Sequence, residues 1–94
     1  MNSPDQIVPR AAILKALAQY LEDFDMALDL FRELEKRMMY GAHFHPSMNA
    51  EELEKSLEEL LENFPRLVNF ERFKDVPEES WGEVAWAEIS WNLG

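Results

Sequence analysis

The chain has 94 residues, a formal net charge of −10 and no cysteine. This length predicts one domain, and the lack of cysteine excludes disulfides and thiolate-bound metals. The negative charge argues against binding to nucleic-acid phosphates or anionic membranes and favours a basic partner.

The first eight residues are expected to form a loose leader. They lack the basic start and apolar core of a secretory signal peptide. The apolar runs of the chain are too short to span a membrane. We therefore expect a cytoplasmic protein.

Residues 9–40 are predicted to form one long amphipathic helix, because apolar residues recur every three or four positions. The residues of this stripe that we expect to mediate self-association are Leu14, Leu17, Leu21, Phe24, Leu28 and Phe31. About 31 helical residues would measure roughly 46 Å, whereas a compact chain of this size is roughly 32 Å across. A partner, most simply a second copy in a two-fold dimer, would cover the overhang. The alternative is a break near residues 22–25, where Asp is a poor interior helix former.

Residues 41–47 are predicted to form a loop, because Gly41 and Pro46 both interrupt regular structure. In an extended segment His43 and His45 would point the same way, which makes them weak candidates for a metal site. The alternative is ordinary loop polarity, with Phe44 anchoring the loop. We expect no metal and no cofactor.

A second helix is predicted at 49–64, with Asn49 as its cap and Glu52 completing a capping box. Its leucines should pack antiparallel to the first helix. The glutamates on its outer side that we predict to bind a partner are Glu51, Glu54, Glu58, Glu59 and Glu62. Like charges four residues apart destabilise a helix, so this excess of acid indicates a binding surface. The alternative is that the acids only keep the protein in solution.

Two shorter helices are predicted at 65–74 and 78–91. The last contains Trp81, Trp86 and Trp91, whose spacing of five prevents the three rings from sharing one helix face. We expect one or two of these rings in the core and another exposed as a partner-binding anchor. The alternative places all three in the core.

The residues that nucleophilic catalysis requires are scarce. There is no Cys or Thr, no serine lies in a nucleophile-elbow context, and the three glycines form no phosphate-binding loop. We predict that the protein is not an enzyme.

The sequence thus predicts an all-α fold, a small helical bundle with one long N-terminal helix and two or three shorter ones. The predicted function is a non-enzymatic protein-binding module, an inhibitor or adaptor. It would act as a homodimer and present its acidic helical surface to a basic site on a partner protein.

Three other functions remain open at this stage. The first is a nucleic-acid mimic, whose carboxylates replace phosphates and inhibit a nucleic-acid-binding protein. The second is an oligomeric binder of a small anionic ligand, in a pocket lined by Tyr20, Arg32, Lys36 and Arg37. The third is a purely structural oligomer subunit.

Overall fold

The structure is a computed structural model that describes residues 9–37, 44 and 47–93. Its four α-helices are α1 (Arg10–Asp23), α2 (Ala27–Lys36), α3 (Ala50–Asn63) and α4 (Trp81–Leu93). Three short 3₁₀ helices join α3 to α4: η2 (Pro65–Leu67), η3 (Phe70–Asp75) and η4 (Glu78–Ser80). No strand occurs in these residues, and the predicted all-α fold class is confirmed.

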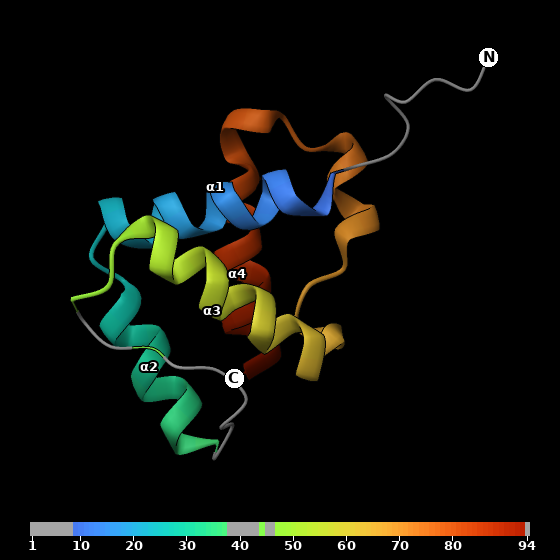
Figure 1. The fold of residues 1–94 in the computed structure, drawn as a ribbon. Helices are drawn as coiled ribbons and strands as arrows, with labels where there is room; N and C mark the ends of the chain where they lie inside the picture. Colours follow the sequence, from blue (N-terminus) through green and yellow to red (C-terminus); the bar gives the residue numbers. More distant parts are fainter. Residues whose placement is uncertain (1–8, 38–43, 45–46, 94) are drawn as a thin grey trace.

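Helix α1 packs against both α3 and α4 (Figure 1). Helix α3 runs antiparallel along it, as predicted, and α4 crosses behind both helices. The leucines of α1 and α3, together with Ala85 and Ile89 of α4, are almost completely buried. These faces remove apolar surface from water, which is the main favourable contribution to the stability of such a small domain.

The predicted continuous helix over 9–40 is wrong, because α1 ends at Asp23 and α2 begins only at Ala27. At the break the N–H of Met26 donates to the carbonyl of Leu21 (2.8 Å), and the N–H of Asp25 donates to that of Glu22 (3.2 Å). These two bonds define a Schellman motif, which needs a left-handed residue after the helix.

Asp25 supplies that left-handed residue, with a φ of 55°. Aspartate is one of the few residues other than glycine that adopt this conformation routinely, because its short polar side chain can hydrogen-bond locally. Helix α2 consequently leaves α1 in a different direction (Figure 1). The overhang from which we predicted a dimer is absent, and residues 38–40 of the predicted helix lie outside the described part.

Replacing Asp25 with glycine is expected to raise the free energy of unfolding by about 0.5 kcal/mol, because glycine adopts a positive φ without steric cost. Lys15→Gly, at an exposed position in the interior of α1, should instead lower it by about 0.5–1 kcal/mol. Urea unfolding of the two variants tests the turn, since a loss of stability in both would contradict the Schellman geometry.

The start of α3 is capped as predicted. The Asn49 side chain accepts from the N–H of Glu52 (2.9 Å), and the Glu52 carboxylate accepts from the N–H of Asn49 (3.1 Å). Glu22 at the end of α1 accepts from the N–H of Ala50 (3.0 Å). Three of the first donors of α3 are therefore satisfied by side chains.

Asn49→Ala is expected to destabilise the fold by about 1 kcal/mol, because it leaves a helix N-terminal donor without its cap. Lys55→Ala, an exposed change on the same helix, should stay within about 0.5 kcal/mol. Thermal unfolding measures both, and equal effects of the two changes would argue against a stabilising cap.

A single helix over 65–74 is also wrong. Val68 and Asn69 are extended, so this segment forms η2 and η3 in its place. The segment is tied to α4 by side chains: Asn92 Nδ2 donates to the carbonyl of Leu67 (2.9 Å), and Arg72 Nη1 donates to Glu88 Oε2 (2.7 Å). The helix predicted at 78–91 is present as η4 followed by α4.

Helices α1 and α4 are in close contact at Gly82. A Cβ atom at this position would lie 2.6 Å from the carbonyl oxygen of Ala16 and 2.8 Å from Cβ of Tyr20. Only glycine fits such a contact without moving a backbone. The two helices separate beyond this crossing, and the space between them forms the groove described below.

Candidate protein-interaction surfaces

The outer side of α3 carries the predicted acidic face. Glu51, Glu58, Glu59 and Glu62 are exposed and Glu54 is half-buried. The ion pairs that the described residues form are Lys36–Glu33 and Arg72–Glu88, and neither involves these five glutamates. The five carboxylates therefore have no basic partner in the described part of the chain. We call these five residues the α3 acidic face.

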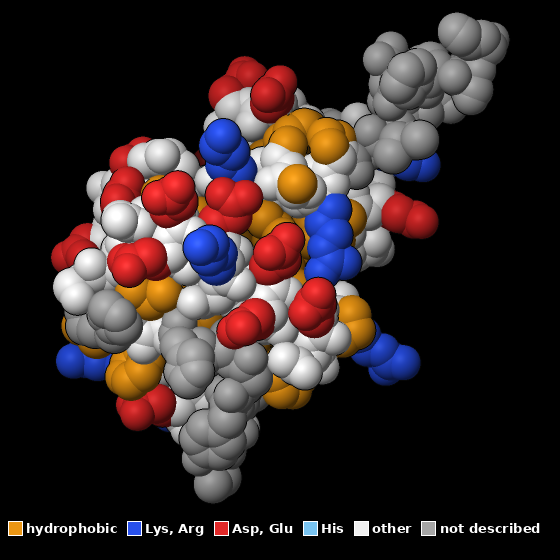
Figure 2. Space-filling model, viewed as in Figure 1, with side chains coloured by type: hydrophobic (Ala, Val, Ile, Leu, Met, Phe, Trp, Pro, Cys, Tyr) orange, Lys and Arg blue, Asp and Glu red, His pale blue; other side chains and the backbone are white. Residues whose placement is uncertain are grey.

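Figure 2 shows that acidic side chains are spread over the side of the molecule formed by α1 and α3, with some Lys and Arg among them. Glu52 is not part of the α3 acidic face, because its carboxylate accepts a hydrogen bond in the capping box. The α3 acidic face is therefore part of a wider negative surface, which attracts basic molecules over several ångströms.

The tryptophans are divided between core and surface. Trp81 and Trp86 are half-buried against the core, and Trp81 Nε1 donates to the carbonyl of Val76 (3.0 Å). Trp91 is 83% exposed. It lies about 180° around α4 from Gly82, a buried residue of that helix. Of the three rings, Trp91 has the exposure that the predicted partner-binding anchor requires, and it lies on α4 and not on the helix that carries the α3 acidic face.

The predicted self-association stripe is divided in the same way. Leu14, Leu17 and Leu21 are buried within this chain's own core, so they are not available to a second copy. Leu28 and Phe31 are half-buried, whereas Phe24 is 64% exposed. The break after α1 turns Phe24 outward and leaves it on the surface.

An acidic groove that the sequence did not predict lies beside Phe24. It encloses about 400 Å³ between α1 and the start of α4. Its walls are Gln19, Tyr20, Asp23 and Phe24 on one side and Glu78, Glu79 and Glu83 on the other, with Ala16 and Gly82 at the helix crossing. The rings of Tyr20 and Phe24 are 4.8 Å apart and tilted by 43°. We call this feature the Phe24 groove.

The distance between its two walls along the sequence explains why sequence reasoning missed this groove. Its walls come from segments more than fifty residues apart, so no local spacing joins them. The available signal was Gly82, because a glycine inside a helix pattern often marks a close approach of another backbone.

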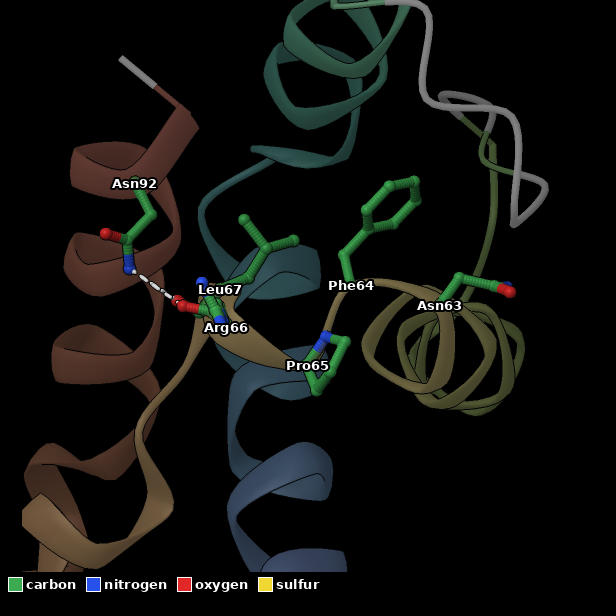
Figure 3. A pocket seen from close by; sticks show the side chains of 6 residues that line it. All are labelled: Asn63, Phe64, Pro65, Arg66, Leu67 and Asn92. Atoms are coloured by element: carbon green, nitrogen blue, oxygen red, sulfur yellow. Dashed lines mark hydrogen bonds between the residues drawn. The ribbon is translucent and has the colours of Figure 1, made fainter.

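A second hollow of about 410 Å³ lies where α3, η2 and the end of α4 meet (Figure 3). The figure shows Asn92 pointing to the carbonyl of Leu67, and the ring of Phe64 pointing toward α2. Asn63 Nδ2 donates to the carbonyl of Glu59 (3.0 Å). The two amide side chains that line this hollow are thus engaged with backbone carbonyls, and Arg66 is the charged residue among its described lining residues.

The remaining predicted sites are the metal site and the pocket for an anionic ligand. No group of three His, Asp or Glu side chains suited to a metal ion occurs in residues 9–37, 44 and 47–93. His43 and His45 lie outside those residues. For the anionic-ligand pocket, Arg32, Lys36 and Arg37 are exposed on or just after α2, whereas Tyr20 lines the acidic groove.

Comparison of the chain with protein-family models, curated proteins and solved structures gives no match. Among the described helices, none is both long and apolar enough to cross a bilayer. The fold and the surface geometry are therefore the basis for assigning a function.

Proposed function

We propose that this protein is a non-enzymatic, cytoplasmic binding module that acts as an inhibitor or adaptor by engaging a basic site on a partner protein. The observation that carries the proposal is the α3 acidic face, whose five carboxylates project outward without described basic partners. A net charge of −10 on 94 residues adds a long-range field of the same sign.

The acidic face would act mainly on the rate of association. Complementary charges steer the encounter of two proteins and raise the rate constant well above that of a neutral pair. Exposed charges add little to stability by themselves. The role we assign to the glutamates is therefore attraction and orientation, while apolar contacts supply the affinity at short range.

The test is capture of a partner from a lysate of the native host by the wild-type protein and by two variants. The first variant removes four of the five charges of the α3 acidic face, by Glu54→Gln, Glu58→Gln, Glu59→Gln and Glu62→Gln, and is called the variant with a neutralised α3 acidic face. The second removes the same charge from exposed acids elsewhere, by Asp29→Asn, Glu35→Gln, Glu71→Gln and Asp75→Asn. We expect the first variant to lose the partner and the second to retain it.

Both variants have the same net charge, so the comparison separates a defined surface from overall acidity. Equal capture by all three proteins would contradict the proposal and favour a structural subunit whose acids only interact with water. Equal loss by both variants would indicate attraction by net charge alone, without a binding site on α3.

Nucleic-acid mimicry is a second candidate that one observation favours. From Glu51 to Glu62 the five carboxylates occupy roughly 16 Å of helix axis and about 140° of its circumference. The four intervals between them average roughly 4 Å along the helix axis, comparable to the spacing of about 3.4 Å along one DNA strand. Under this hypothesis nucleic acid competes with the protein for its partner, and a captured partner that still holds its nucleic acid contradicts it.

Self-association stays a prediction, and it now depends on Phe24. The break at Asp25 removes the argument from helix length, and exposed Phe24 is the main apolar residue of the stripe left on the surface. Light scattering of the wild-type protein and of Phe24→Ala tests it. A dimer that Phe24→Ala weakens would support the prediction, and a monomeric wild-type protein would contradict it.

A further inference from the structure

We propose that the Phe24 groove receives an arginine side chain of the basic partner. This inference rests on the proposed function and names a contact site separate from the α3 acidic face. The groove combines an exposed aromatic wall, a wall of carboxylates and a hollow of about 400 Å³. That volume is at the small end of protein ligand sites and suits one side chain better than a folded element.

The aromatic wall is held in place by the fold. Tyr20 belongs to the last turns of α1, and Phe24 is the residue at which the helix ends. The Schellman turn fixes the backbone that follows Phe24. Phe24 is nevertheless 64% exposed, so its ring can accept a further contact without rearrangement of the core.

The opposite wall is negatively charged. Glu78 and Glu79 of η4 and Glu83 of α4 face the aromatic pair, and Asp23 flanks it on α1. The only side-chain hydrogen bond that a described residue gives to these four carboxylates comes from the neutral amide of Gln19, which donates to Asp23 Oδ1 (2.9 Å). Among the residues that the structure describes, no Lys or Arg lines the groove. The groove is therefore suited to a cation.

Arginine fits both walls better than lysine does. Its planar guanidinium stacks on aromatic rings and donates two parallel hydrogen bonds to a carboxylate. A lysine ammonium is a compact and strongly hydrated charge that offers no plane to stack. Phosphate groups and other anions would be repelled by the same carboxylates.

The experiment is an NMR titration of the isotope-labelled, full-length protein with a blocked oligo-arginine peptide. An oligo-lysine peptide of equal length is the comparison. We expect saturable shifts of the Tyr20 and Phe24 ring signals and of the Gly82 amide, with the arginine peptide binding roughly fivefold more tightly. Equal binding of both peptides, or shifts that do not include these residues, would overturn the inference.

Two variants make the assignment specific. Phe24→Ala changes an exposed residue and should weaken arginine binding by roughly fivefold. Trp91→Ala removes another exposed aromatic on the surface of α4 and should leave it unchanged. If both variants weaken binding equally, the aromatic contact is not confined to the groove and the inference fails.

The variant with a neutralised α3 acidic face separates this inference from the proposed function. It should retain the ring shifts of Tyr20 and Phe24 while losing the partner captured from lysate. Peptide shifts confined to α3 would overturn the groove assignment and leave the proposed function intact. Shifts in the groove, together with unimpaired capture by the α3 variant, would support the groove assignment and contradict the proposed function.

Discussion

Gly82→Ala is expected to lower the free energy of unfolding by about 2 kcal/mol. Alanine is the better helix former by about 1 kcal/mol, so propensity alone predicts a gain in stability. The added methyl group would meet the carbonyl oxygen of Ala16 at 2.6 Å and Cβ of Tyr20 at 2.8 Å. Both atoms are fixed by the backbone of α1, and such overpacking costs about 1–3 kcal/mol or more.

Helix propensity and overpacking predict changes of opposite sign in the free energy of unfolding, so the measurement separates them. Ser90→Ala lies on the exposed side of the same helix and should be neutral or slightly stabilising. Denaturant unfolding, with equal slopes for all proteins, compares the two variants. A Gly82→Ala protein as stable as the wild type would mean that α1 and α4 do not cross at this residue.

Glu88→Ala is expected to destabilise the protein by about 2–3 kcal/mol. The Glu88 side chain is only 8% exposed, and its two oxygens accept from the N–H of Asn69 and from Arg72 Nη1. Hydrogen bonds to a charged group contribute about 1.5–3 kcal/mol, more than neutral ones. Its removal leaves the N–H of Asn69 without this acceptor and removes one of the side-chain contacts that hold this segment to α4.

Glu83→Ala is the matched control, because Glu83 is exposed on the same helix. It should change stability by no more than about 0.5 kcal/mol. Amide hydrogen exchange adds a local measurement: the N–H of Asn69 should exchange faster in Glu88→Ala and at the wild-type rate in Glu83→Ala. Comparable loss of stability in the two variants would contradict a specific role for Glu88.

The parts of the fold predicted correctly are those with strong local signals. The Asn49–Glu52 capping box needs only two residues three apart, and both hydrogen bonds are present. The apolar positions of α3 repeat with the helix period, and they are buried as expected. Pro65 begins η2, since its fixed φ suits a first turn and it cannot continue α3.

The break between α1 and α2 was not the favoured prediction, because the apolar period runs through it. Phe24, Leu28 and Phe31 continue the spacing of Leu21 in the sequence. The fold at this point depends instead on one left-handed residue, Asp25. A periodic pattern reports which residues share a face of an unbroken helix, but it does not detect a single change of backbone conformation.

The candidate site was predicted in part for a related reason. The exposure of the α3 glutamates follows from their positions opposite the leucines of one helix. The Phe24 groove depends on a crossing between helices that are distant in sequence, at Ala16 and Gly82. Local spacing does not report such a crossing. The one sequence signal of it was Gly82, a glycine within a predicted helix.

The most direct test of acidic recognition is the salt dependence of association with the captured partner. We predict that the association rate falls at least roughly tenfold between about 50 and about 500 mM NaCl, because salt screens the field of exposed carboxylates. The variant with a neutralised α3 acidic face should already associate slowly at low salt. An association rate that does not change with salt, for the wild-type protein, would contradict the account.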